Sequence, residues 1–195
     1  KAGYTNLSIG ELVKTRIHGA TPAFAQEVSA AGFGKVSIDD LVKMRIHGVT
    51  PEFVRELREL GYKDLGVEDV VKLRIHGASP AFIREMRDLG YKDLPLNDVV
   101  RMRIHGVSAG YVKELKDLGY SSVPADDLVR MRIHGVTLDE IDALGAAGLR
   151  GLSADDLVRF RIHQVRPEFI REMRALGFTN ADEDDFVKMR IHKVD

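Results

Sequence analysis

The tripeptide Arg-Ile-His recurs at a fixed interval of 29 residues along the whole chain, and this interval restricts the fold more than any other feature. The motif occurs seven times without insertion or deletion between copies, and it contains all 7 histidines of the protein. A constant period between about 20 and 50 residues is typical of repeat proteins, in which each unit packs on its neighbours. The sequence therefore predicts a single repeat array, with units at about residues 7–35, 36–64, 65–93, 94–122, 123–151 and 152–180 and a partial unit at residues 181–195.

The second repeat contains the start and stop signals of two helices. Ser37 is a good N-cap for a first helix, whose apolar residues follow at helical spacing until Gly48 ends it. Thr50 and Pro51 are typical of the start of a second helix, and Gly61 marks its end. We therefore predict an all-α fold, an α-solenoid of 29-residue helix-turn-helix repeats, with six helix pairs and a seventh first helix.

The composition argues against several classes of function. The 29 Lys and Arg residues nearly balance the 30 Asp and Glu residues, so no strong net field attracts nucleic acid or an anionic membrane. The absence of cysteine excludes disulfides, thiolate metal sites and a cysteine nucleophile. No apolar run reaches the roughly 18 residues of a membrane-spanning helix, and no phosphate-binding loop, zinc-protease or serine-hydrolase motif occurs. The sequence thus predicts a protein that is not an enzyme and that uses no cofactor or metal.

The arginine of the motif is predicted to face the interior. On a helical wheel Arg45 falls within about 40° of Leu41 and Ile38, and Ile46 is assigned to the same face. A buried charge needs a partner, and a glutamate flanks the apolar stripe of the second helix. We predict a structural ladder of ion pairs between the two kinds of helix, made by Arg45, Arg74, Arg103, Arg132 and Arg161 with Glu56, Glu85, Glu114, Glu140 and Glu172. The alternative is that these arginines extend along apolar surface and bind carbonyl groups at a helix end.

The fifth repeat offers an internal check on this ladder. Ala143 occupies the position of the glutamate, while Glu140 occupies the position where the other copies have Phe or Tyr. The carboxylate has moved by one turn but has not been lost. This is the change that we expect if Arg132 or Arg161 must be neutralised.

The histidines are predicted to lie on the outer edge of the first helices, on the side of Lys43. An imidazolium at a helix C-terminus interacts favourably with the helix dipole, so a cap is the simplest role. Neighbouring histidines should stand roughly 9–10 Å apart, too far to share a zinc ion whose ligands lie about 2 Å from it. The remaining alternatives are a row that contacts a ligand and a shared response to pH. The candidate ligand-facing residues are His47, His76, His105, His134, Lys43, Lys72, Arg101 and Arg130.

The turn between the two helices, Ile46 to Pro51, resembles the helix-hairpin-helix motif of DNA-binding proteins. That motif has two glycines whose turn holds a phosphate with backbone amides. Here the first glycine is present in five copies, but Thr or Ser replaces the second and repeat six has Gln164 and Arg166. A helix N-terminus can still bind an anion, whereas the near-zero net charge provides little release of counterions. Tandem nucleic-acid hairpins are therefore kept as an alternative.

At the level of the whole repeat, the segment LVKMRIHGVTPEFVRELRELGYKDL (residues 41–65) is similar to tandem repeats of bacterial multidomain proteins. These include the extracytoplasmic C-terminal tails of membrane metallopeptidases related to penicillin sensors. The metallopeptidase motif is absent, so no catalytic residue carries over. The resemblance implies an accessory module of the periplasm or cell envelope. Since Lys1 begins in mid-repeat, we expect the chain to be a piece of a longer protein.

The leading functional expectation is a non-catalytic scaffold that binds a protein or peptide along one face of the array. A structural spacer without a ligand is the alternative from a different class, and a nucleic-acid binder is the third. The sequence leaves the ligand and the oligomeric state open.

Overall fold

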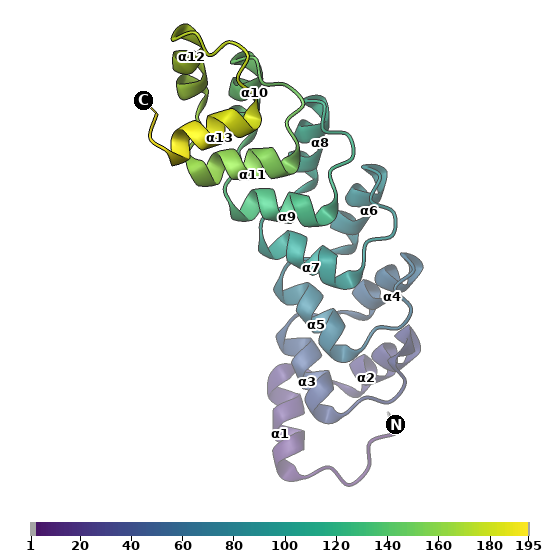
Figure 1. Ribbon diagram of the computed structural model, residues 1–195. Coiled ribbons are helices and arrows are strands. Elements are labelled where there is room, and N and C mark those ends of the chain that lie inside the picture. Colours follow the sequence, from purple (N-terminus) through teal and green to yellow (C-terminus); the bar gives the residue numbers. More distant parts are fainter. Residues whose placement is uncertain (1–2, 195) are drawn as a thin grey trace. The chain divides into compact units, whose positions relative to one another are not determined.

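The computed structural model describes residues 3–194, which form thirteen α-helices and no β-strand (Figure 1). The predicted all-α repeat fold is confirmed. Among the described residues, no helix has the length and apolar character needed to cross a lipid bilayer. The first helices of the repeats are α1 (Ile9–His18), α3 (Ile38–Ile46), α5 (Val67–Ile75), α7 (Leu96–Ile104), α9 (Ala125–Ile133), α11 (Ala154–His163) and α13 (Glu183–Ile191). The second helices are α2 (Pro22–Val28), α4 (Pro51–Glu59), α6 (Pro80–Asp88), α8 (Ala109–Asp117), α10 (Leu138–Ala146) and α12 (Pro167–Ala175), and a wider turn, η1 (Ser29–Phe33), follows α2.

The helices begin where the sequence places their caps. The hydroxyl of Ser37 accepts a hydrogen bond from the amide of Asp40 at 3.0 Å, at the start of α3. The hydroxyl of Thr50 does the same for the amide of Phe53 at 3.2 Å, at the start of α4. Each bond satisfies an amide that has no partner within its helix, which explains why both starts can be read from the sequence.

The turn between the two helices depends on a left-handed glycine. Gly48 has φ 67°, a conformation that disfavours side chains with a Cβ. The chain therefore reverses after α3, and the amide of Val49 donates to the carbonyl of Met44 at 2.8 Å. This closure satisfies a carbonyl group at the helix end and sends the chain directly into α4.

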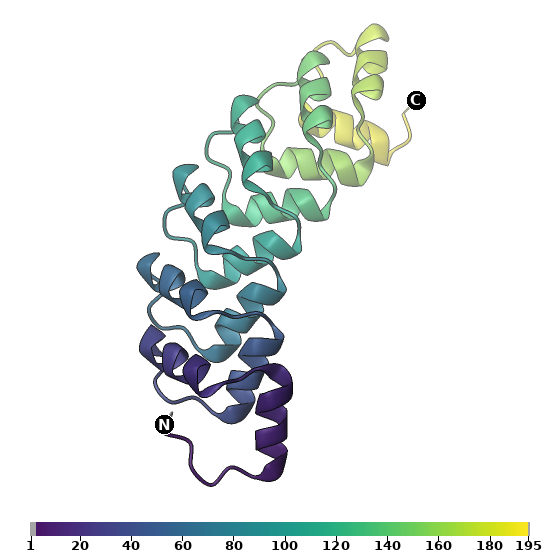
Figure 2. The ribbon, with the colours of Figure 1, turned by 180° about the vertical axis from the view of Figure 1, so that it is seen from behind.

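The array divides into two compact units (Figures 1 and 2). In the first unit, residues 3–88 and 92–100, helices α1, α3 and α5 lie side by side in one layer, and α2, α4 and α6 form the second layer. In the second unit, residues 89–91 and 101–194, helices α9, α11 and α13 form one layer and α8, α10 and α12 the other. The residues of α7 are shared between the units, with the division after Val100.

The core of each unit lies between its two layers. Met44 from α3 and Leu57 from α4 are fully buried, and Val49 seals the turn between these helices. Helix α1 has a first-helix neighbour on one side only within the described residues. Leu12 and Val13 of α1 are consequently 53% and 51% exposed, although their equivalents in α3 are buried.

The prediction that Ile46 faces the core is wrong. Ile46 is 56% exposed, while Met44 two residues earlier has no exposed surface. Each residue of an α-helix rotates the side-chain direction by about 100°, so residues i and i+2 point about 200° apart. Met44 and Ile46 therefore cannot lie on the same face. The same exposure, between 50% and 70%, occurs at Ile17, Ile75, Ile104, Ile133, Ile162 and Ile191.

The hydroxyl of Tyr111 has no hydrogen-bond partner in the core of the second unit. Tyr111 occupies on α8 the position of Phe53 on α4, its residue is 7% exposed, and its buried oxygen makes no hydrogen bond. An unsatisfied buried polar group costs about 1–3 kcal/mol. We therefore expect Tyr111→Phe to leave the free energy of unfolding unchanged or to raise it by up to about 1 kcal/mol. Urea denaturation followed by circular dichroism measures this change, and a clear loss of stability would mean that the hydroxyl is bonded.

Candidate ligand-binding surface at the ends of the first helices

The cations predicted to face a ligand are paired between neighbouring repeats instead. In each pair a cation of one first helix contacts an acidic or amide side chain near the start of the next first helix, 25 residues later. The hydrogen bond from Lys43 to Glu68 raises the pKa of Lys43, and the bond from Arg159 lowers the pKa of Asp184. We call this set the cation–acid row. Its pairs are Lys14–Asp39, Lys43–Glu68, Lys72–Asn97, Arg101–Asp126, Arg130–Asp155 and Arg159–Asp184.

The arginines of the motif lie over aromatic rings of the preceding second helix. The arginine and the ring are 21 residues apart in the sequence in every case. Distances from the guanidinium carbon to the ring centroid are 4.9 Å for Arg45–Phe24, 4.9 Å for Arg74–Phe53, 5.0 Å for Arg132–Tyr111 and 4.8 Å for Arg190–Phe169. A guanidinium at this distance is attracted to the ring face, and its stem stays covered while its charge keeps its water.

The predicted ladder of buried arginine–glutamate pairs is therefore wrong as a general feature. No charged side chain among residues 3–194 is buried, so the burial predicted for Arg45, Arg74, Arg103, Arg132 and Arg161 does not occur. Glu56 pairs at 2.6 Å with Arg84 of the next second helix, and not with Arg45 or Arg74. The other glutamates of the predicted ladder that flank the second-helix stripe, Glu85, Glu114 and Glu172, are exposed. Stacking avoids the cost of dehydrating a guanidinium, which explains why the ladder is not needed.

The fifth repeat is the exception, and it confirms one pair. Nη1 of Arg161 lies 3.5 Å from Oε2 of Glu140, which occupies the position of the missing aromatic ring. The side chain of Glu140 is 14% exposed, and its Oε2 makes no hydrogen bond despite the ion pair. The carboxylate thus replaces the ring as the partner of the motif arginine, and the pair with Arg161 is one of the two that the sequence comparison between repeats predicts.

Four cations of the second helices form contacts that sequence reasoning missed. Each donates a hydrogen bond to a backbone carbonyl at the end of the preceding second helix, 26 or 27 residues earlier. A backbone acceptor has no side-chain signature, so the sequence carries no signal for these bonds. We call them carbonyl clamps, and they are Arg58 to Gly32, Arg87 to Leu60, Lys116 to Leu89 and Arg174 to Ala147.

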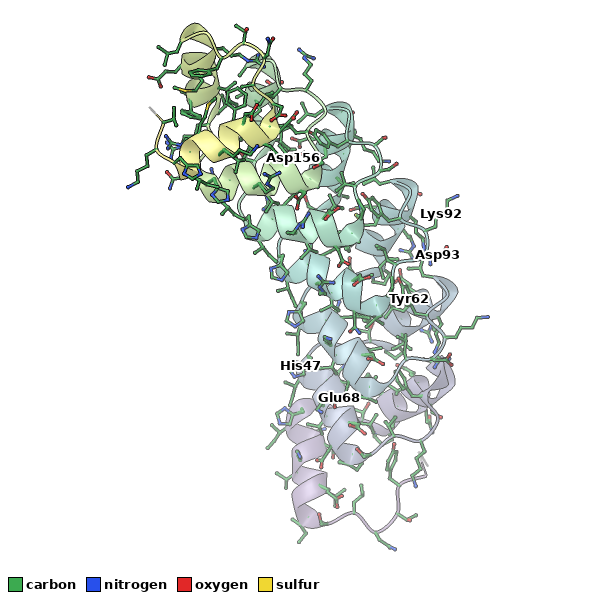
Figure 3. The ribbon with its side chains drawn as sticks, viewed as in Figure 1. His47, Tyr62, Glu68, Lys92, Asp93 and Asp156 are labelled. Carbon is green, nitrogen blue, oxygen red and sulfur yellow. The ribbon has the colours of Figure 1, made fainter. Side chains whose placement is uncertain are left out.

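The histidines and isoleucines of the motif have no comparable partners. The imidazole of His47, like those of the six equivalent histidines, forms no hydrogen bond or ion pair with any residue of the described chain. Only the backbone amide of His47 closes the helix, by donating to the carbonyl of Lys43 at 3.1 Å. Figure 3 shows His47 at the margin of the first-helix layer, on the side away from Tyr62. The ring makes no capping hydrogen bond and is exposed or half-exposed, and its interaction with the helix dipole stays a prediction.

The C-terminal ends of the first helices, which carry the three side chains of each motif copy, form one margin of each unit, which we call the RIH edge. In the first unit it consists of the Arg-Ile-His copies at residues 16–18, 45–47 and 74–76. In the second unit it consists of the copies at residues 103–105, 132–134, 161–163 and 190–192. Comparisons of the chain with models of protein families, with curated protein sequences and with solved structures gave no match.

No metal-binding group accompanies this edge within the part of the chain that the structure describes. Between residues 3 and 194, no group of three or more His, Asp or Glu side chains is placed so that it could hold a metal ion. The edge instead offers guanidinium groups, branched apolar side chains and imidazoles. These groups can contact a ligand through charge, hydrogen bonds and apolar packing.

The exposed stacking of Arg74 leads to a stability prediction. We expect Arg74→Ala to lower the free energy of unfolding by no more than about 1 kcal/mol, the size of an exposed cation–π interaction. Breaking a buried ion pair would cost about 3–5 kcal/mol instead. Urea unfolding of the variant and the parent chain distinguishes the two values, and a loss in the higher range would restore the buried ladder.

Proposed function

We propose that this chain is a non-catalytic helical-repeat module that binds an extended peptide or protein segment along the RIH edge. One observation carries the proposal. The cation–acid row and the carbonyl clamps engage charged side chains in contacts between repeats, but the isoleucines and imidazoles of the RIH edge have no such contact. A repeated side chain without an internal partner is available for an external one.

The isoleucine is the most informative residue of this edge. A single exposed Ile on a protein surface is ordinary, but here the same position is at least half exposed in all seven copies. Isoleucine has a lower helix propensity than alanine, leucine or lysine, so the helix itself does not favour it at an exposed position. Its branched side chain is stiff, and covering it with a ligand therefore costs little conformational entropy.

The isoleucines of neighbouring motif copies form a row, because the first helices that carry them are neighbours in each unit. Helices α1, α3 and α5 contact one another in sequence order, so Ile17, Ile46 and Ile75 follow one another along the first unit. Packed helices have axes about 8–10 Å apart. An extended segment that crosses the three helices can contact all three isoleucines, whereas a compact ligand would reach one or two.

A structural spacer is the second candidate, and the contacts between repeats favour it. Besides the cation–acid row, loop tyrosines also form hydrogen bonds between repeats. The hydroxyl of Tyr62 donates to the carbonyl of Leu94 at 2.7 Å, 32 residues later. Such bonds stiffen an array without any ligand. A spacer, however, gives no reason for a row of exposed isoleucines.

The test uses the isoleucine methyl groups as reporters. The full chain, with labelled isoleucine methyls, is titrated with pools of extended peptides and with duplex DNA at low salt. Binding along the edge should shift the signals of Ile46 and Ile75 and leave Ile9 unchanged, although Ile9 is 82% exposed. The double variant Ile46→Ser/Ile75→Ser should abolish binding, while the matched surface variant Ile9→Ser should retain it.

Two other results of this titration would contradict the proposal. If no peptide pool shifts any of the edge signals, the spacer is the better description. If duplex DNA alone binds, and does so with a steep dependence on salt, the module is a nucleic-acid binder.

A further inference from the structure

We infer that the ligand of the RIH edge is an acidic peptide in the polyproline II conformation, with a carboxylate at every third residue. The inference rests on the proposed function and names the chemistry of the partner. Three features of the edge lead to it: held guanidinium groups, a surplus of positive charge, and the interval between repeats.

The guanidinium groups of the edge are held in place before any ligand arrives. Arg45 is confined on one side by the ring of Phe24 and on another by the turn at Gly19, where a Cβ would lie only 3.3 Å from Nη2 of Arg45. The guanidinium of Arg74 has the same arrangement at Gly48, where that distance is 3.4 Å. The glycine of each motif therefore also provides the space in which the next arginine lies.

These guanidinium groups retain donors for a ligand. Arg45 and Arg74 are exposed and make no hydrogen bond or ion pair with residues 3–194. A planar guanidinium presents its N–H groups as a fork that matches a carboxylate. Because stacking has already fixed the fork, little side-chain entropy is lost when the carboxylate binds.

The motif arginines of the first unit are not neutralised by a carboxylate of the protein. Of the acidic side chains nearby, Glu68 is engaged in the cation–acid row with Lys43, and Glu56 is engaged with Arg84. Arg45 and Arg74 keep their charge without a carboxylate partner among residues 3–194, whereas Arg161 is a copy that has one. In that copy the protein supplies its own carboxylate, Glu140, which shows that this guanidinium accepts one at the position of the ring.

The interval between repeats selects the conformation of the ligand. Neighbouring first helices lie about 8–10 Å apart. A polyproline II helix rises about 3.1 Å per residue and has three residues per turn, so every third side chain returns to the same face after about 9.3 Å. A β-strand repeats its face after about 6.6 Å and would lose register at the second arginine. The polyproline conformation also needs no hydrogen bonds of its own, and the flat rings of proline suit contact with Ile46 and His47.

The two units differ in what they offer such a peptide. The first unit has Arg45 and Arg74 free of carboxylates on adjacent helices. In the second unit Arg161, which lies between Arg132 and Arg190 in the row of motif arginines, already forms an ion pair with Glu140. We therefore assign the stronger site to the first unit.

The experiment measures binding of synthetic 12-residue peptides to the full chain by fluorescence anisotropy at low and at moderate salt. The probe is a peptide of four Pro-Pro-Glu triplets. One control has the same composition with its four glutamates in one block, and a second has glutamine in place of glutamate. We expect the triplet peptide to bind at least tenfold more tightly than either control.

Two arginine variants separate the edge from general positive charge. Arg45→Gln/Arg74→Gln should weaken binding of the triplet peptide at least tenfold. Arg55→Gln/Arg84→Gln removes two exposed arginines from the second helices of the same unit, where each pairs with a glutamate, and it should leave binding within twofold. Circular dichroism of both variants checks that the helices are retained.

The contradicting outcomes are distinct from those of the proposed function. Equal affinity for the triplet and block peptides would exclude the three-residue register. Shifts of the edge isoleucines by a peptide without acidic residues would leave the proposed function intact and overturn this inference. Tighter binding of a deoxythymidine dodecamer than of the triplet peptide would assign the edge to nucleic acid. Failure of every peptide to bind would overturn both.

Discussion

Replacing Met44 with alanine should lower the free energy of unfolding of the first unit by about 2–5 kcal/mol. Replacing Ile46 with alanine, only two residues later, should change it by no more than about 0.5 kcal/mol. Met44 is fully buried between the helix layers, so its removal leaves a cavity that the packed side chains cannot fill completely. Ile46 loses mainly solvent-exposed surface, and alanine has the higher helix propensity.

The pair of variants is measured by urea denaturation with circular dichroism at 222 nm. The equivalent pair in the second unit, Met131→Ala and Ile133→Ala, is the matched control, because Met131 is fully buried and Ile133 is 56% exposed. The same contrast should appear in both units. If the methionine and the isoleucine variants lower the free energy of unfolding by similar amounts, the isoleucines are buried in the core. The RIH edge then has no row of exposed apolar side chains.

The features that could be predicted from the sequence are local ones. The caps at Ser37 and Thr50, and the left-handed turn at Gly48, depend on residues within four positions of each other. Such interactions are local and do not depend on tertiary packing, so they indicate the helix boundaries before the packing is known. The exact period then extends the same boundaries to every copy.

The wrong assignment of Ile46 came from the width of the apolar face. Ile46 lies about 40° from Val42 on the wheel, which suggests a shared face. The buried residues of α3, however, point on average roughly 110° away from Ile46. A helical wheel gives the direction in which each side chain points, but it does not show how much of the helix circumference the neighbouring helix layer covers.

The contacts between repeats differ in how far the sequence could reveal them. The constant spacing of 21 residues between a motif arginine and a ring, with Glu140 as the one acidic substitute, was available as a signal. The cation–acid row was harder to identify, because Lys43 has an acidic residue one turn earlier as well as Glu68 in the next repeat. The carbonyl clamps required the structure, since their acceptors are backbone atoms.

Restoring the repeat pattern in the fifth repeat should stabilise the second unit more than any other exposed or half-exposed substitution considered above. Glu140→Phe replaces a largely covered carboxylate, whose Oε2 makes no hydrogen bond, with the ring that the equivalent positions carry. Burying a phenylalanine side chain contributes about 1.5–3 kcal/mol, and Arg161 gains a stacking partner in place of an ion pair. We expect the free energy of unfolding to rise by about 1–3 kcal/mol.

The same variant connects stability with the inferred ligand. Removing Glu140 frees the guanidinium of Arg161, so the second unit gains an uninterrupted run of arginines along its edge. Binding of the Pro-Pro-Glu peptide should therefore become tighter in Glu140→Phe than in the parent chain. A more stable variant with unchanged binding would support the packing argument and contradict the role of these arginines as carboxylate receptors.

Gly145 is a further departure of this repeat, and it occupies the position of the carbonyl clamps at Arg58, Arg87, Lys116 and Arg174. A pocket of about 350 Å³ lies beside it, lined in part by Leu118 and Arg150. A Cβ at residue 145 would meet its nearest neighbour at an ordinary 3.8 Å. Gly145→Arg should raise the free energy of unfolding by about 1.5–2.5 kcal/mol, because it improves helix propensity and can donate to the carbonyl of Leu118.

Gly145→Ala separates these two contributions. Alanine supplies the gain in helix propensity, about 1 kcal/mol, but it cannot reach a carbonyl group. The difference between the arginine and the alanine variants therefore measures one clamp in isolation, with an expected value of about 0.5–1.5 kcal/mol for a single hydrogen bond. If the two variants are equally stable, the clamps contribute nothing to the packing of consecutive second helices, and the stability of the array comes from its apolar layers alone.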